Sequence, residues 1–293
     1  MGGAGVGAAF SIPKATNMTE QLALPEDFKG KDLLPALSNQ TQLIPSGDIV
    51  GYDNVEPEDL VLPVIKCLQG MSPEVMQEAH PDARPGRFFL TSTREAFAGP
   101  LRVLVVHHHR SRALFPDSKN PKTASLKVCL SPDALKGTVY GYCSDCEYAE
   151  WGEDRSPPPC SLSHNFVIAT ANGPALLRFN RTSFKAGKEF ASSCMLSVPR
   201  KNLWYHPAEL RSVVATTKLP NGQEATYYRM SINWMRDVVT PEPMQQEARK
   251  LFEQVQAAFS AGKLGSDELD DDRPATTKKP AQKKDEFEDT IPF

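Results

Sequence analysis

The stretch Asn165-Phe-Val-Ile-Ala-Thr-Ala-Asn-Gly-Pro-Ala-Leu-Leu-Arg-Phe-Asn180 decides the fold that we expect. Two runs rich in apolar residues flank the turn residues of 171–174, and this pattern predicts an antiparallel hairpin. Working outward, Trp204–Thr217 and Thr226–Trp234 flank Asn221-Gly222, which predicts a second hairpin. The chain therefore has the short antiparallel strands of a mainly β protein.

Other segments fit the same architecture. Arg87–Thr91 and Leu101–His107 are β-rich runs separated by the turn residues Gly99 and Pro100. Pro63 interrupts the apolar run Leu60–Val75 and suits an edge strand or an extended entry to the core.

Two helices complete the pattern. Residues 183–196 predict a short helix, and residues 241–261 predict a longer one that Thr240 caps. Its apolar side chains fall on one face. The fold class that we expect is mainly β with a few helices: an OB-fold-like β-barrel with an inserted zinc-binding segment and a disordered acidic tail. A β-sandwich would give a similar pattern.

Charge is unevenly distributed along the chain. In total, 33 Lys and Arg residues face 36 Asp and Glu residues, a net charge of −3. Residues 1–60 carry a net charge of −6 and residues 267–293 a net charge of −4, whereas residues 61–266 carry +7. A basic body between acidic ends indicates a polyanionic partner.

The expected compartment is the cytoplasm. No stretch reaches the ~18 consecutive apolar residues of a membrane helix, and residues 1–10 lack the charged start of a signal peptide. We expect a protein of the bacterial cytoplasm or nucleoid, encoded by a cell or by a phage, with no membrane partner. No motif for a small-molecule cofactor is present, and we expect no enzyme activity.

Four cysteines have the spacing of a metal site. The pair separated by two residues lets both sulfurs face one ion, and the flanking cysteines follow at thirteen residues on either side. Zinc favours four thiolates in a closed structural site. The sequence predicts structural zinc (Zn²⁺) in an insert over residues 128–161, with buried thiols or redox chemistry as alternatives. The four are Cys129, Cys143, Cys146 and Cys160.

Three consecutive histidines raise the question of a second metal site. On a strand, His107 and His109 would share one face and His108 would point away. No carboxylate pair with suitable spacing accompanies them. We expect a strand end or a phosphate-facing patch rather than a catalytic metal.

Basic and aromatic residues lie close together in several strands. Binding of single strands without sequence specificity needs cations along a groove and rings on which bases stack. Because side chains alternate between the two faces of a strand, about half of these residues belong to the core. The candidates for binding single-stranded DNA are Arg102, Arg110, Arg112, Arg178, Lys185, Lys188, Arg200, Lys201, Trp204 and Tyr228.

Residues 285–293, Asp-Glu-Phe-Glu-Asp-Thr-Ile-Pro-Phe, combine acidic and apolar side chains at the end of the chain. Pro292 restricts the backbone, which lowers the entropy cost of docking. This segment resembles the C-terminal tips of bacterial single-stranded DNA-binding proteins, although that family usually has an acidic residue at the position of Thr290. The resemblance implies docking of partner proteins through Glu288, Asp289, Ile291, Pro292 and Phe293.

The resemblance and the charge pattern lead to one expected function. The mid-chain cysteines look like those of phage-encoded members. We expect a protein that coats single-stranded DNA in replication, recombination and repair, and that recruits a polymerase, primase, helicase or nuclease. The expected domains are a flexible segment 1–45, a DNA-binding domain 46–265 and a disordered tail 266–293. The alternatives are a strand-annealing or recombination mediator and a zinc-containing nucleic-acid enzyme.

Overall fold

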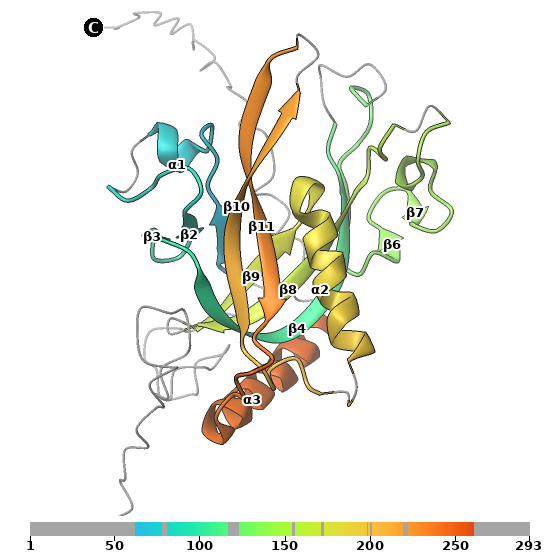
Figure 1. The fold of residues 1–293 in the computed structure, drawn as a ribbon. Helices are drawn as coiled ribbons and strands as arrows, with labels where there is room; N and C mark the ends of the chain where they lie inside the picture. The colour runs from blue at the N-terminus through green and yellow to red at the C-terminus, as the bar shows by residue number, and fades with distance from the viewer. Residues whose placement is uncertain are drawn as a thin grey trace, which may run out of the picture. The chain divides into compact units, whose positions relative to one another are not determined.

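The computed structural model describes residues 62–77, 81–116, 123–153, 156–170, 173–197, 199, 201–218 and 222–260. All of them belong to one compact unit, Asp32–Phe293. This part of the chain is mainly β, with three α-helices and two short 3-10 helices (Figure 1). The predicted segments 1–45 and 266–293 lie outside the described residues.

Most strands join one curled sheet. All neighbouring strands of this sheet run antiparallel, except that β1 and β9 are parallel. The order is β11 (Glu224–Trp234), β10 (Ala208–Lys218), β4 (Leu101–Leu114), β8 (Ser161–Thr170), β9 (Gly173–Phe179), β1 (Val64–Cys67), β2 (Phe88–Leu90) and β3 (Glu95–Phe97), and β5 (Cys129–Ser131) pairs with β4.

Both predicted hairpins are confirmed. β8 pairs with β9 as far as Thr170 opposite Gly173, whose φ of +99° is a conformation that favours glycine. β10 pairs with β11 along the whole of both strands. Only the first three residues of β10 pair with β4, so the rest of this second hairpin extends beyond the sheet (Figure 1).

Of the two structures expected around Pro63, the edge strand is wrong, whereas the extended entry to the core is confirmed, because Pro63 leads directly into the buried start of β1. This strand lies between β9 and β2 in the sheet interior. Pro63 precedes the first residue of the strand, where its missing N–H costs no ladder bond. Its carbonyl still accepts a 2.7 Å bond from the backbone N–H of Leu176, which extends the parallel pairing.

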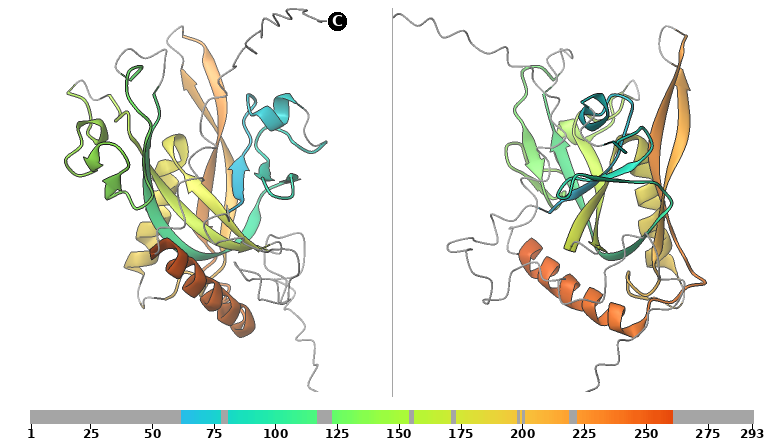
Figure 2. Two further views of the ribbon diagram at one scale, coloured as in Figure 1. Left: turned by 180° about the vertical axis from the view of Figure 1, so that it is seen from behind. Right: turned by 90° about the vertical axis from the view of Figure 1, so that its left-hand side faces the viewer.

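The two long helices pack against different strands of the curled sheet. α2 (Phe184–Leu196) contacts β8, β9 and β11 and contributes Phe190 to the core inside the curled sheet. α3 (Glu242–Ser260) packs against β4 (Figure 2). Its buried face consists of Met244, Ala248, Leu251 and Val255, a set that matches the predicted periodicity of 3.6 residues.

One side chain joins the two ends of the curl. The side-chain amide of Gln69, just after β1, donates to the carbonyl of Tyr228 in β11 at 2.7 Å. Its side-chain oxygen accepts from the backbone N–H of Tyr228 at 2.9 Å. These two bonds resemble the pair that the backbone of a neighbouring strand would form with Tyr228. The sheet is thus a curled half-barrel, and this shape is compatible with an OB-like barrel.

The segment between β4 and β8 contains little regular structure. After β5 come the two-residue strands β6 (Lys136–Gly137) and β7 (Gly141–Tyr142) and a 3-10 turn, Glu147–Ala149. We call residues 129–160 the cysteine insert. Within the described residues, no helix has the length and apolar character needed to cross a membrane.

Candidate nucleic-acid interface

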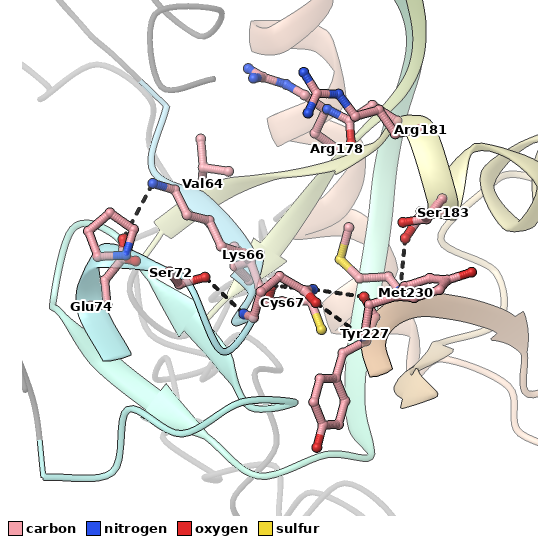
Figure 3. Close-up of a pocket in the computed structure, with 16 residues that line it drawn as sticks. Val64, Lys66, Cys67, Ser72, Glu74, Arg178, Arg181, Ser183, Tyr227 and Met230 are labelled. Atoms are coloured by element: carbon pink, nitrogen blue, oxygen red, sulfur yellow. Dashed lines mark hydrogen bonds and ion pairs between the residues drawn. The ribbon is translucent and has the colours of Figure 1, made fainter. Parts of the chain in front are cut away.

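A cleft of about 480 Å³ lies where β1, β9 and β11 approach one another (Figure 3). α1 (Pro73–Met76) contributes to one wall, and the 3-10 turn Arg181–Ser183 between β9 and α2 contributes to another. The cleft therefore collects residues from segments that lie far apart in the sequence. We call it the β1–β11 cleft.

Three cations and one carboxylate line the β1–β11 cleft. They are Lys66 from β1, Arg178 from β9, Arg181 from the turn after β9, and Glu74 from α1. Lys66 points toward Glu74, with 3.5 Å between its ammonium nitrogen and a carboxylate oxygen (Figure 3). Arg178 is only 7% exposed. The excess of positive charge in a concave site attracts anions.

Arg181 has an unusual backbone conformation. Its φ is +41°, in the left-handed region that residues with a Cβ rarely occupy. Such a conformation costs about 1–3 kcal/mol and persists where the surrounding structure over-determines it. The hydroxyl of Ser183, two residues on, accepts a 2.9 Å bond from the backbone N–H of Met230. This bond ties the turn to β11 across the cleft.

Two adjacent tyrosines of β11 line the cleft, and because neighbouring side chains of a strand point to opposite faces, their rings lie on different sides of β11. Tyr227 and Tyr228 both line it. The ring of Tyr228 lies against Gly86, where an added Cβ would come within 2.5 Å of the ring. Gln69 fixes the backbone of Tyr228 through the two bonds described above. Cations and rings that share one groove are the two elements that unpaired nucleic acids require.

The structure brings only some of the predicted residues to this cleft. Arg178 and Tyr228 line it. Arg102 and Arg110 lie elsewhere on β4, and Arg112 lies beside the cysteines. Lys185 and Lys188 are exposed on α2, where Lys185 pairs with Glu189.

The remaining candidates lie after α2. The ammonium group of Lys201 sits 4.3 Å from the ring centroid of Tyr205. Trp204 does not line the cleft: it is buried and packs on Phe252 of α3. Arg200 lies outside the described residues.

Sequence reasoning missed Lys66, Arg181 and Tyr227 as members of the site. Lys66 is the sole charged residue inside a short apolar run, which is a weak signal for a functional cation. Arg181 and Tyr227 adjoin Arg178 and Tyr228 closely in the sequence, but no local pattern tells which of these side chains share a cleft. Their meeting depends on the long-range approach of β11 to β1.

The four cysteines of the insert line a second, much smaller cavity of about 10 Å³. All four are free thiols. Burial raises the pKa of the Cys160 thiol to about 11, and the neighbouring Arg112 guanidinium opposes that rise. Among the described residues, no three His, Cys, Asp or Glu side chains stand in an arrangement that holds a metal ion. The structure itself thus contains no preformed metal centre in that part.

The three histidines of β4 divide between the two faces of the strand, as predicted. His107 and His109 contact Phe259 of α3, whereas His108 stacks on Phe166 and lies 2.9 Å from His164 between ring nitrogens. The expectation of a phosphate-facing patch or a strand end is wrong, because the rings pack in the middle of β4.

Burial also controls the charge of these rings. Desolvation, with smaller contributions from neighbouring histidines and arginines, lowers the pKa of His109 to about 3 and that of His108 to about 4. The pKa of His164 falls to about 4, first through burial and then through Arg110 and Lys188. At neutral pH these rings are uncharged and offer no cation to a phosphate.

Residues 29–259 match the family model of the Pam3 phage gp34-like protein. The chain belongs to the Pam3 phage gp34-like family. The match includes the curled sheet, both long helices, the β1–β11 cleft and the cysteine insert of this gp34-like protein. The searches of curated proteins and of solved structures gave no match. The family supports the expectation of a phage protein.

Proposed function

We propose that this gp34-like protein binds single-stranded DNA in the β1–β11 cleft, during phage DNA replication, recombination and repair in a host cell. The observation that carries the proposal is the meeting of Lys66, Arg178 and Arg181 with Tyr227 and Tyr228 around one cleft. The net charge of +7 over residues 61–266 supports it, since a basic body attracts a polyanion.

A single strand suits this cleft better than a duplex. Its unpaired bases can turn toward the tyrosine rings, and each stacked base contributes ~1–3 kcal/mol. Arg181 and Lys66 would contact phosphates, and such contacts make the affinity fall with rising salt, while the buried Arg178 would add positive charge to the wall of the cleft. On this proposal the half-barrel is an OB-like DNA-binding domain.

The acidic segment at residues 285–293 would recruit partner proteins. Its resemblance to the tips of bacterial single-stranded DNA-binding proteins supports this role, although the segment lies outside the described residues. Replacement of Phe293 by Ala would remove partner docking and leave the affinity for DNA unchanged. Pull-down of replication and repair proteins by the two forms tests this part of the proposal.

Two arginines provide a matched test of the cleft. Arg181 and Arg94 both have a positive φ, of 41° and 58°, but only Arg181 lines the cleft. Replacing either by Gly removes one positive charge and relieves backbone strain, so both variants should unfold at the same or a higher urea concentration. Arg181→Gly should weaken binding to single-stranded DNA about 10-fold, consistent with the ~1.5–3 kcal/mol of a charge-assisted bond. Arg94→Gly should have little effect.

Fluorescence anisotropy of a labelled oligothymidylate at two salt concentrations measures these affinities, with a duplex of equal length as competitor. An equal loss of DNA affinity in both variants would mean that the effect depends only on the net charge of the protein. That result would reject the cleft as the interface. Absence of binding by the wild-type protein at low salt would reject the proposed function itself.

A further inference from the structure

The cysteine insert contains a site that the proposed DNA-binding role does not use. Its four thiols come from four places: β5, the segment after β7, the start of the 3-10 turn, and the residue before β8. They line a single cavity of about 10 Å³. That volume holds one atom-sized occupant and no organic ligand.

The backbone of the insert is shaped around the sulfurs. A Cβ at Gly137 would lie 2.5 Å from the sulfur of Cys129, so a larger residue here would force that sulfur to move. The backbone N–H of Cys143 donates to the carbonyl of Leu135 at 2.8 Å, and that of Cys160 donates to Tyr148 at 2.9 Å. These bonds fix the chain on both sides of the cavity that the four cysteines line.

The insert has too little apolar core to hold itself together. Its buried cluster consists of Leu114, Cys129 and Cys160, with three partly buried neighbours. Larger apolar side chains of the same segment face solvent, including Leu135 at 63% exposed and Trp151 at 69%. A small unit without a core needs a disulfide or a metal for stability. None of these cysteines forms a disulfide.

A cation stands beside the cavity. Arg112 of β4 lines it and donates long, 3.5 Å bonds to the backbone carbonyls of Ala149 and Cys160. Four thiolates around one divalent ion leave an excess of two negative charges. A guanidinium that lines the same cavity offsets part of that excess and lowers the cost of burying it.

We propose that Cys129, Cys143, Cys146 and Cys160 bind one zinc ion as a closed tetrathiolate site, with Arg112 as its charge-balancing neighbour. Each thiol releases its proton to solvent as its sulfur binds the ion. Among the described side chains, no three donors are arranged closely enough to hold an ion as they stand. Binding therefore requires the cysteine side chains to rotate toward the centre of the cavity that they already line.

Arg112 connects the zinc site to the main sheet. Arg112 lies on β4 opposite Ser131 of β5 and Leu162 of β8. Zinc would thus join the insert to the far ends of β4 and β8, two strands of the main sheet. Loss of the ion should loosen the insert and these strand ends, and should leave the opposite, cleft-bearing end of the sheet folded.

Metal content and cobalt spectroscopy of the full-length protein test the site. The purified wild-type chain should contain one zinc per molecule, measured by mass spectrometry of the metal. Replacement by Co²⁺ should give the visible bands of a tetrahedral site and the near-ultraviolet bands of sulfur-to-cobalt charge transfer. Cys143→Ser should lose the metal or the intensity contributed by one thiolate. Cys67→Ser, outside the insert, should change neither.

The outcomes of these experiments distinguish a failure of the zinc site from a failure of the proposed function. Retention of full zinc content and an unchanged cobalt spectrum in Cys143→Ser would overturn the site. So would a wild-type protein that takes up no Zn²⁺ or Co²⁺ after expression and reduction in zinc-containing medium. Neither outcome bears on the DNA affinity of the cleft, which the Arg181 and Arg94 pair measures independently.

Discussion

The cleft-bearing half of the sheet and the cysteine insert are stabilised in different ways. Around the cleft, Phe166, Phe179 and Phe190 pack edge to face in a continuous apolar core between the sheet and α2. The insert has four sulfurs and a few aromatic edges in place of such a core. The first region is stabilised by the apolar area that its core buries. The second depends on the few contacts around its four cysteines. Changes to the core should therefore affect the whole chain, and changes to the insert should remain local.

Phe166→Ala should have the largest effect. This ring is fully buried and contacts the rings of His108, Phe179 and Phe190, so its loss leaves a cavity that costs about 3–5 kcal/mol of unfolding free energy. Urea denaturation followed by tryptophan fluorescence measures the change. A loss below about 1 kcal/mol would mean that the core is not continuous.

Gly137→Ala should disturb the insert alone. The added methyl group would meet the Cys129 sulfur, and overpacking of this kind costs about 1–3 kcal/mol. Limited proteolysis should show faster cleavage within residues 123–153, while the urea midpoint of the main sheet stays unchanged. Gly70→Ala is the matched control because no atom lies within 4 Å of its added Cβ. Equal proteolysis of the two variants would contradict a tightly packed insert.

Acid should destabilise the core half through its buried histidines. The folded-state pKa of His109, about 3, and that of His108, about 4, lie below the ordinary value of 6.5, so the unfolded chain binds protons more tightly. Stability is therefore complete above pH 6.5 and falls as the pH drops from 6.5 toward these values. By pH 5 the loss is about 1–2 kcal/mol for each ring.

The variant His109→Gln isolates this contribution. Its unfolding free energy, measured by urea denaturation between pH 7 and pH 5, should depend less steeply on pH than that of the wild-type protein. Equal slopes would show that His109 is not buried in its neutral form.

Gln69→Glu should have the smallest effect on stability. A carboxylate cannot donate to the carbonyl of Tyr228, so one of the two bonds across the curl is lost at about 1 kcal/mol. Because the bond closes the cleft, its loss should open the structure locally. The rate of hydrogen exchange at the amides of residues 227 and 228 should therefore increase by more than the loss of global stability alone would cause. Uniform exchange over the whole sheet would show that Gln69 does not join its two ends.

The sequence alone determined the local elements of this protein. The turn at residues 171–174 and Asn221-Gly222 predicted two hairpins, and the spacing of apolar residues predicted α3, because these patterns depend on neighbours within a few residues. The alternation of His107, His108 and His109 between faces followed from the same local geometry. The spacing of four cysteines marked the insert, although no strand order could be derived from it.

The tertiary structure decided which elements meet. Gln69 bonds to Tyr228 over 159 positions, and the cleft exists only because the sheet curls far enough to bring β11 to the end of β1. Packing of α3 buried Trp204, which its sequence neighbours placed among the DNA-binding candidates. Local propensity fixes the direction of a side chain relative to its own strand. The curl of the sheet and the packing of the helices fix whether that direction leads to a cleft or to the core.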